Sequence, residues 1–324
     1  MSASVLSVRN LTTSFLTERE VRPAVRDVSF DVGVRETLAI VGESGSGKSV
    51  TALSIMRLLD PADVRMDGRI MLGETDLLKL PEQRMQRIRG NDIAMIFQEP
   101  MTSLNPVLAV GEQIAEAVRL HLGYDRKKAW AHAVESLKLV EIPDAARRAS
   151  DYPHHMSGGM RQRVMIALAI ACRPALLIAD EPTTALDVTI QAQVLALLDR
   201  LRREIGMGVL FITHNLGVVA EIADRVTVMY AGQVVESAPV RELFRTPRHP
   251  YTRALLDCMP SRAAVDGNGR RVVRSIPGQV SRVEQGCSFA PRCAHAAPRC
   301  AVETPQLETE GVRQMRCLRW RELA

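Results

Sequence analysis

Aromatic residues and long hydrophobic runs are both scarce in this chain of 324 residues. Only 4% of the residues are Phe, Trp or Tyr, so we expect a core built from Leu, Ile, Val, Ala and Met. The longest uninterrupted apolar run, residues 164–172, is nine residues long, whereas a membrane-spanning helix needs about 20. The first residues lack the basic and apolar segments of a secretory signal. We therefore expect a cytosolic protein that does not cross a bilayer.

Lysine is absent from the last part of the chain, yet the positive charge is concentrated there. Residues 261–324 hold eleven arginines and six acidic residues, which accounts for the net charge of +5 of the whole chain. The remaining residues are therefore balanced in charge. A nucleic-acid-binding protein usually spreads its positive charge along a face or a stripe, so this distribution disfavours nucleic acid as a partner.

Short apolar segments alternate with helical stretches over the first 235 residues, which predicts an α/β domain. Between about residues 99 and 172 helical periodicity dominates, notably at 111–122 and 126–140, which predicts a helical insert. After about residue 260, proline and glycine interrupt any periodicity. We therefore expect two domains, 1–259 and a small irregular cysteine-containing unit at 260–324. Strands are expected at residues 5–8, 38–41, 93–97, 176–179, 209–212 and 226–230.

The first chemical motif lies between a predicted strand and a predicted helix. It consists of Gly42, Glu43, Ser44, Gly45, Ser46, Gly47, Lys48 and Ser49. This is the phosphate-loop pattern G-x-x-x-x-G-K-[ST] in its required context. The backbone N–H groups of such a loop wrap phosphates, and the N-terminus of the following helix adds a favourable dipole. We expect Lys48 to reach the β- and γ-phosphates of a nucleotide and Ser49 to bind Mg²⁺.

A second apolar segment, residues 176–179, ends in two adjacent carboxylates, Asp180 and Glu181. Ligands of open α/β sheets bind at the carboxyl ends of the strands, so both carboxylates are expected to face the nucleotide. We expect Asp180 to bind Mg²⁺ and Glu181 to orient and deprotonate the attacking water. Together with the phosphate loop, this pair predicts hydrolysis of ATP.

A third motif, Ser157-Gly158-Gly159, precedes an apolar helical stretch. Ser157 can cap that helix, and the glycines leave the helix end accessible to an anion. With this motif 23 residues before Asp180, the chain resembles the ATP-binding-cassette (ABC) ATPases. The resemblance implies that Ser157 and Gly159 touch ATP bound to the opposite subunit of a dimer. It also implies that Gln98 senses Mg²⁺ and the attacking water.

The same resemblance assigns three further residues. It implies that residues 184–187, which end at Asp187, form a loop that crosses the dimer interface, that His214 contacts the γ-phosphate, and that Phe15 stacks on adenine. Three positions depart from the usual pattern of the family: Met156 in place of Leu, Met160 in place of Gln, and Asn215 where many relatives have Asp. None of these departures removes a phosphate contact.

Residues 98–106, 248–252 and 286–293 resemble the ATPase subunits of dipeptide and oligopeptide importers, a group that also includes nickel importers. This resemblance implies a second, related ATPase subunit as the partner in a heterodimer, two transmembrane permease subunits and an extracytoplasmic substrate-binding protein. It places the chain at the cytoplasmic face of the inner membrane. Import of nickel or another small solute stays open as an alternative.

Two alternatives belong to other classes: a soluble ABC ATPase acting on nucleic acid, and a cassette that binds ATP without turnover. Only 108 residues separate Lys48 from Ser157, and a second phosphate loop is absent from the sequence. These two features disfavour a DNA-repair or chromosome-associated ATPase, which usually has a long coiled coil or two cassettes. The presence of Glu181 and His214 argues against a cassette without turnover.

The tail contains a cysteine cluster, Cys287, Cys293, Cys300 and Cys317. Its spacing does not match the closely spaced cysteine pairs of zinc sites, and four thiolates can also hold a [4Fe–4S] cluster. The resemblance to peptide importers favours the iron–sulfur cluster, while zinc or unligated thiols stay open. Arginines near the cysteines could balance an anionic cluster, form a solvated basic face or contact anionic lipids. These arginines are Arg282, Arg292, Arg299, Arg313 and Arg316.

Overall fold

The computed structural model shows two compact units. Each unit is assembled from separate stretches of the sequence, and residues 260–323 belong to the same unit as the phosphate loop. The first unit comprises Met1–Leu6, Asp31–Glu36 and Met71–Phe211, and the second comprises Ser7–Phe30, Thr37–Ile70 and Ile212–Ala324. The structure describes residues 4–17, 20–98, 103–184, 186–265, 271–272, 274–280 and 282–323.

Parallel strands form the centre of the first unit. The strands β6 (Ile93–Ile96), β7 (Leu176–Asp180) and β8 (Gly208–Ile212) lie in the order β8-β7-β6, and β6 pairs with β7 in parallel register. Every residue of β7 and β8 is buried, which explains why these strands read as continuous apolar runs. The carboxyl ends of β6 and β7 therefore meet at one edge of the sheet.

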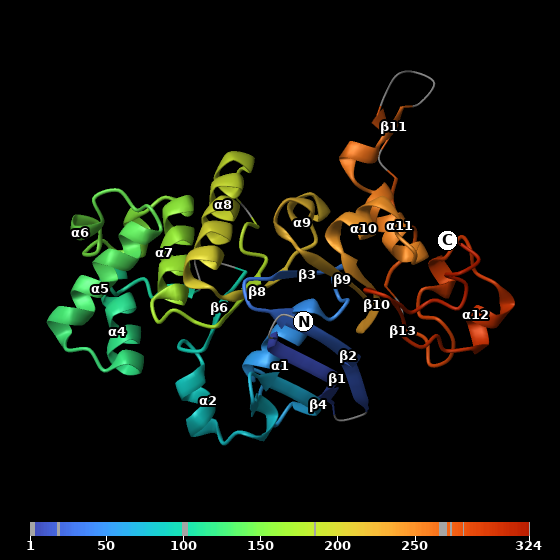
Figure 1. The fold of residues 1–324 in the computed structure, drawn as a ribbon, viewed down its shortest axis with the longest axis horizontal. Coiled ribbons are helices and arrows are strands. Elements are labelled where there is room, and N and C mark those ends of the chain that lie inside the picture. The colour runs from blue at the N-terminus through green and yellow to red at the C-terminus, as the bar shows by residue number, and fades with distance from the viewer. Residues whose placement is uncertain are drawn as a thin grey trace. The chain divides into compact units, whose positions relative to one another are not determined.

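Helices make up most of the rest of the first unit, including α4, α5, α6 and α7 within the segment predicted as a helical insert. Asp125 caps α5 (Arg126–Leu139) by accepting a hydrogen bond from the backbone N–H of Lys128. Gly123 ends α4 (Val110–Leu122) in a left-handed conformation. Figure 1 shows the helices α4, α5 and α7 close together, in green. The helices are α2 (Glu82–Ile88), α4 (Val110–Leu122), α5 (Arg126–Leu139), α6 (Ala145–Arg148), α7 (Gly158–Ile170) and α8 (Val188–Ile205).

The sheet of the second unit contains strands from both ends of the sequence. β3 (Thr37–Val41) pairs in parallel with β9 (Arg225–Tyr230), and β10 (Gln233–Pro239) runs antiparallel to β9. The tail then adds β14 (Arg313–Met315) antiparallel to β10, with β13 (Glu308–Glu310) beside it. The tail is therefore not wholly irregular, because two of its segments extend the sheet.

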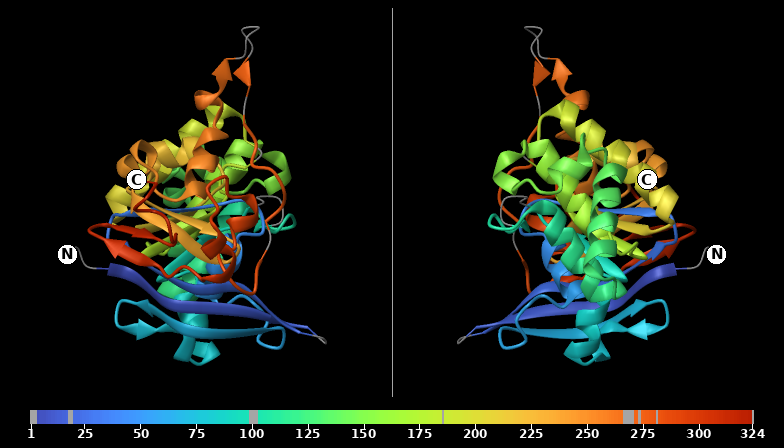
Figure 2. Two further views of the ribbon diagram at one scale, coloured as in Figure 1. Left: turned by 90° about the vertical axis from the view of Figure 1, so that its right-hand side faces the viewer. Right: turned by 90° about the vertical axis from the view of Figure 1, so that its left-hand side faces the viewer.

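A separate sheet contains β2 (Val21–Gly33), β1 (Ser4–Leu16) and β4 (Val64–Leu72) in that order. Most of these residues belong to the second unit, and the strands lie side by side in every view (Figures 1 and 2). The end of β4 pairs with β5 (Thr75–Asp76). The other elements of the second unit are α1 (Lys48–Met56), α9 (Leu216–Ile222), α10 (Val240–Arg245), α11 (Pro250–Asp257), α12 (Pro298–Val302), β11 (Ala264–Val265) and β12 (Arg271–Val272).

All six strands that the sequence predicts are present, with boundaries that differ by up to eight residues at β1. The sequence analysis missed β2, β4 and β10, whose apolar residues are mixed with charged ones. Within the described ranges, no helix is long and apolar enough to cross a membrane.

Candidate nucleotide-binding site

The phosphate loop leaves β3 through glycines that no other residue could replace easily. A Cβ on Gly42 would lie 2.2 Å from the carbonyl oxygen of Met229, so a neighbouring backbone occupies that space. Gly47 caps α1 with a φ of 99°, a conformation that side chains disfavour. The loop can therefore pass close to the sheet and present its backbone N–H groups at the start of α1.

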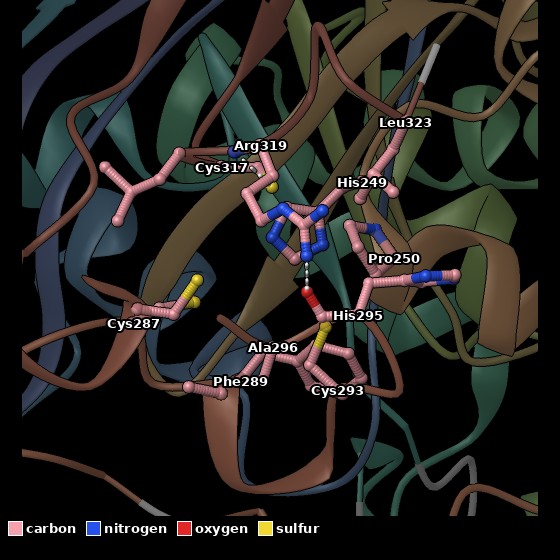
Figure 3. A pocket seen from close by; sticks show the side chains of 13 residues that line it. His249, Pro250, Cys287, Phe289, Cys293, His295, Ala296, Cys317, Arg319 and Leu323 are labelled. Atoms are coloured by element: carbon pink, nitrogen blue, oxygen red, sulfur yellow. Dashed lines mark hydrogen bonds between the residues drawn. The ribbon is translucent and has the colours of Figure 1, made fainter. Parts of the chain in front are cut away.

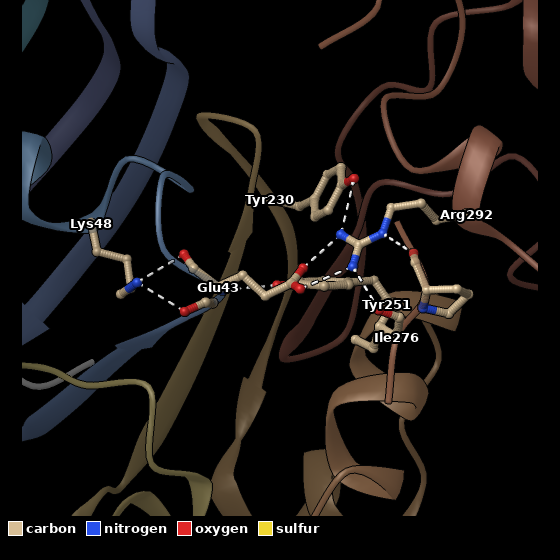
Figure 4. A network of polar contacts seen from close by, with 8 residues as sticks. Glu43, Lys48, Tyr230, Tyr251, Ile276 and Arg292 are labelled. Atoms are coloured by element: carbon tan, nitrogen blue, oxygen red, sulfur yellow. Dashed lines mark hydrogen bonds and ion pairs between the residues drawn. The ribbon is translucent and has the colours of Figure 1, made fainter. Parts of the chain in front are cut away.

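Lys48 is folded back onto this loop. Its Nζ donates hydrogen bonds to the carbonyl oxygens of Gly42, at 2.8 Å, and Glu43, at 3.0 Å (Figure 4). The side chain is buried, while Ser49 in the first turn of α1 is exposed. Phosphate oxygens that enter the loop would exchange with these carbonyls as acceptors for the ammonium, because a charged acceptor makes the stronger hydrogen bond.

An open cavity of about 980 Å³ borders the loop. Phe15 lines it together with Gly45, Gly47 and Val50, so the predicted adenine-stacking residue lies next to the phosphate loop. The tail also contributes Arg282 to this cavity. The sequence analysis missed that contribution, because nothing in the spacing of the sequence connects the tail with β1.

The carboxylates predicted to act in hydrolysis lie in the first unit. Glu181 follows β7 and accepts hydrogen bonds at Oε2 from Gln98 Nε2, at 3.1 Å, and from Thr184 Oγ1, at 2.9 Å. Asp180 is the buried last residue of β7. Glu181 has a φ of 49°, and such a strained backbone is typical of functional sites. The structure thus brings together the three residues predicted to handle Mg²⁺ and water. It adds Thr184, which the sequence analysis assigned only to the dimer-interface loop, as a second donor to Glu181.

The signature residues start α7. Ser157 accepts a hydrogen bond from the backbone N–H of Met160 at 3.3 Å and so caps the helix as predicted. A Cβ on Gly159 would lie 2.9 Å from Cγ2 of Ile190, whereas one on Gly158 would meet nothing within 4 Å. Gly159 therefore allows α7 and α8 to approach, and Gly158 leaves space for a ligand.

Asp187 and His214 each lie beside the start of a helix. Asp187 caps α8 by accepting a hydrogen bond from the backbone N–H of Ile190 at 2.9 Å. His214 is exposed in the segment after β8, and Asn215 caps α9 through the N–H of Gly217 at 2.9 Å. Asn at position 215 thus keeps the cap that an Asp would provide. Residues 99–102 of the importer-like segment 98–106, and Ala185 of the predicted interface loop, lie outside the described residues.

Comparisons with known proteins identify the family of this chain. Residues 25–184 match the family described as ABC transporter, and residues 235–300 match the oligopeptide/dipeptide transporter C-terminal region. A protein of Brucella melitensis named "Putative peptide import ATP-binding protein" is 54% identical, with 99% of this chain and 98% of that protein covered. This chain belongs to the ABC transporter family. It is one of the ATP-hydrolysing proteins of that family, whose activity is coupled to transport.

Two further comparisons support this assignment. A second protein of the same printed name, from Brucella abortus, is 51% identical, with 98% of this ABC ATPase and 95% of that protein covered. A dimeric ATP-binding cassette, solved in a post-hydrolysis state with ADP and Pi, is 28% identical with a TM-score of 0.64. The match covers 73% of this chain and 99% of that cassette.

The predicted Mg²⁺ ligands of this ABC ATPase fit the ion. They are the hydroxyl of Ser49, the amide oxygen of Gln98 and the carboxylate of Asp180, and Mg²⁺ prefers such hard oxygen ligands. The Nε2 group of Gln98 donates to Glu181, which leaves the amide oxygen for the metal. The hydroxyl of Ser49 is exposed at the start of α1, on the loop that would hold the phosphates.

The four tail cysteines line one small cavity, together with His249 and Phe289. Figure 3 shows Cys287, Cys293 and Cys317 around its different sides. Burial raises the pKa of these three thiols, and the neighbouring cysteines raise it further. The thiols are therefore neutral near pH 7 unless a cation binds.

The four thiols could serve as metal ligands, but they are not arranged as a formed metal site. In the part of the chain that the structure describes, no three His, Cys, Asp or Glu side chains are grouped closely enough to hold a metal ion. The cavity that the thiols line has a volume of about 20 Å³, enough for about one water molecule. The number and chemistry of the donors fit a [4Fe–4S] cluster, but binding would require the side chains to move outward.

Four of the five tail arginines named in the sequence analysis pair with carboxylates, while a further one, Arg319, lines the cysteine cavity. Arg313 and Arg316 are less than 10% exposed, so a solvated basic face does not describe them. Arg292 binds a residue of the phosphate loop. The ion pairs are Arg292–Glu43, Arg299–Glu322, Arg313–Glu242 and Arg316–Asp27.

Proposed function

We propose that this ABC ATPase is the energy-supplying subunit of an importer of dipeptides or oligopeptides. The observation that carries the proposal is the match of residues 235–300 to the C-terminal region of oligopeptide/dipeptide transporters. The names of relatives that are 51% to 54% identical over nearly the whole chain support it. A nickel or other small-solute importer is the second candidate, because its ATPase subunits share much of the same sequence pattern.

The residues of the site have distinct tasks in hydrolysis. Lys48 and the loop N–H groups bind the phosphates, and Glu181 accepts a proton from the attacking water. Gln98 and Thr184 hold the Glu181 carboxylate in place through hydrogen bonds to Oε2. Bound Mg²⁺ would neutralise developing negative charge on the phosphates.

The second nucleotide-contacting surface needs a partner cassette. Ser157, Gly158 and Gly159 lie at the N-terminus of α7, where backbone N–H groups favour an anion, and Asp187 lies at the start of α8. We infer that these residues face ATP held by a second, related ATPase subunit, so that a heterodimer binds two ATP molecules. The dimer would then close when ATP binds and open after hydrolysis, which makes it a switch.

The remaining partners follow from an importer of this kind. Two transmembrane permease subunits would provide the path, and an extracytoplasmic substrate-binding protein would deliver the solute. The helical insert would dock on the permeases and hold the chain at the cytoplasmic face of the inner membrane. We also propose that residues 1–259 act as the ATPase domain and residues 260–324 as a tail domain.

The four-cysteine cavity supports a further part of the proposal, a [4Fe–4S] cluster held by Cys287, Cys293, Cys300 and Cys317. Such a cluster would supply cross-links within the tail or store an electron. Anaerobic purification with iron, sulfide and zinc analysis tests it. We expect about four irons and four sulfides per chain, and loss of both in Cys293→Ser. One zinc per chain, or no metal in a folded protein, would refute the cluster.

Uptake by cells tests the proposed function. In a strain without this chain, labelled dipeptide uptake should be lost and should return with the wild-type chain but not with Lys48→Ala. Labelled nickel uptake serves as the comparison. Peptide uptake that is unchanged in the deletion strain, with nickel uptake lost instead, would establish the second candidate and reject the first.

A further inference from the structure

Glu43, the second residue of the phosphate loop, is held at three points. Its backbone N–H donates to the hydroxyl of Tyr251 at 2.9 Å, and its carbonyl oxygen accepts from Lys48 at 3.0 Å. Its carboxylate forms a bidentate ion pair with Arg292, at 2.7 and 2.9 Å. Figure 4 shows Glu43 between Lys48 on one side and the Tyr251 and Arg292 side chains on the other. The position of Glu43 therefore determines where one acceptor of the Lys48 ammonium lies.

Arg292 is built into this contact and is not a surface arginine. Its side chain is only 4% exposed, and its Nε also donates to the carbonyl oxygen of Pro277 at 2.8 Å. The Glu43 carboxylate raises the pKa of Arg292, so the guanidinium stays charged at every working pH. A bidentate, charge-assisted pair is among the stronger polar contacts in proteins. The Glu43 side chain is 30% exposed, so water weakens the pair in part, but the buried guanidinium keeps it better shielded than a surface pair.

The same contact connects the phosphate loop with the cysteine cavity. Arg292 directly precedes Cys293, which lines that cavity. A second connection runs through Tyr251, whose ring lies 5.2 Å from that of Phe289, another lining residue. A change at Cys293 that shifts the local backbone must therefore shift Arg292, and Arg292 in turn holds the loop.

We propose that Arg292 is a positioning residue for the phosphate loop, and that through it the state of the cysteine cavity sets the affinity of this ATPase for ATP. When Arg292 holds Glu43, the loop is pre-organised and the ATP phosphates bind without ordering it first. When the pair is broken, Glu43 loses one of its three anchors and the loop must be ordered during binding. The proposal rests on the proposed function, in which ATP hydrolysis drives import, and adds a control of ATP affinity to it.

Measurement of ATP affinity and turnover on the full chain tests the first half. We expect Arg292→Met to raise the Kd for ATP about tenfold, a typical coupling between sites, while kcat at saturating ATP changes less than twofold. Arg292→Lys, which keeps the charge but not the bidentate geometry, should lie between. The matched control is Arg299→Met: Arg299 precedes Cys300 as Arg292 precedes Cys293, but it pairs with Glu322 inside the tail. It should leave the Kd unchanged.

A double-mutant cycle separates positioning from a general loss of stability. Glu43→Gln weakens the same ion pair from its other end, so Glu43→Gln combined with Arg292→Met should weaken ATP binding no more than the worse single variant. Fully additive losses in Kd would show that Arg292 acts elsewhere. A Kd that is unchanged in Arg292→Met, in a protein that is still folded, would overturn the proposal outright.

The proposed effect of the cysteine cavity on ATP affinity is tested by substituting a cysteine that lines the cavity. Cys293→Ala should raise the Kd for ATP in the wild-type chain but not in the Arg292→Met variant, where the connection is already broken. If Cys293→Ala does not fold, Cys317→Ala is used in its place. An equal effect in both backgrounds, or none in the wild type, would overturn the connection. Failure of the wild-type chain to bind ATP would instead refute the proposed function, so the two failures are distinguishable.

Discussion

The substitution Glu181→Gln separates binding of ATP from its hydrolysis. Gln has nearly the shape of Glu but cannot accept a proton from water at neutral pH. Loss of a positioned general base costs about 10²- to 10⁴-fold in rate, so we expect turnover to fall by at least about 100-fold. The amide oxygen can still accept one of the hydrogen bonds that Gln98 and Thr184 now donate. The free energy of unfolding should therefore change by only about 0.5 kcal/mol, because these contacts are exposed to solvent.

The same variant should strengthen the ATP-dependent association with the partner cassette, because ATP stays bound and unhydrolysed. Steady-state phosphate release measures turnover, and size-exclusion chromatography with ATP measures association. Thr184→Val is the matched control, since it removes one donor to Glu181 and keeps the base, and its turnover should fall only several-fold. Hydrolysis by Glu181→Gln at near the parental rate would refute the assignment of Glu181 as the base.

Two further predictions concern stability. Gly42→Ala should cost about 3 kcal/mol or more, because its Cβ would meet the Met229 carbonyl, whereas Gly45→Ala, with a φ of 77° but open space, should cost about 1 kcal/mol. Urea unfolding checks both, and equal losses would contradict the steric reasoning. Burial lowers the pKa of His249 from 6.5 to about 3. The stability contributed by its neutral ring is present above pH 6.5 and lost toward pH 3, by about 1.4 kcal/mol per pH unit. His249→Asn keeps an acceptor for the Tyr251 N–H and should lack this slope, so an identical slope in both proteins would refute the cause.

The sequence was most informative where the chemistry needs neighbouring residues. The phosphate loop needs glycines at set spacings followed by Lys and Ser within eight residues, so residues 42–49 could be identified without any structure. Buried parallel strands need continuous apolar runs, which made β3, β7 and β8 easy to predict. β2 and β10 were missed because their charged residues, among them the buried Glu236, hide the apolar pattern.

The contacts of the tail could not be predicted, because they join residues that are far apart in the sequence. Arg292 and Glu43 are separated by 249 positions, and nothing in either local pattern indicates the other. The sequence suggested that tail arginines balance an anionic cluster, but the structure pairs Arg292 with the phosphate loop instead. Only the folded backbone decides which carboxylate a buried guanidinium reaches.

The sequence by itself determined that the chain hydrolyses ATP. Each motif for this reaction consists of neighbouring residues that follow one strand, so its spacing can be read along the chain. The tertiary structure alone decided how the tail takes part. In the folded chain β14 pairs with β10, and Arg292 forms an ion pair with Glu43 of the phosphate loop. Both contacts depend on distance in space. Distance along the chain does not specify which strands pair or which side chains form ion pairs.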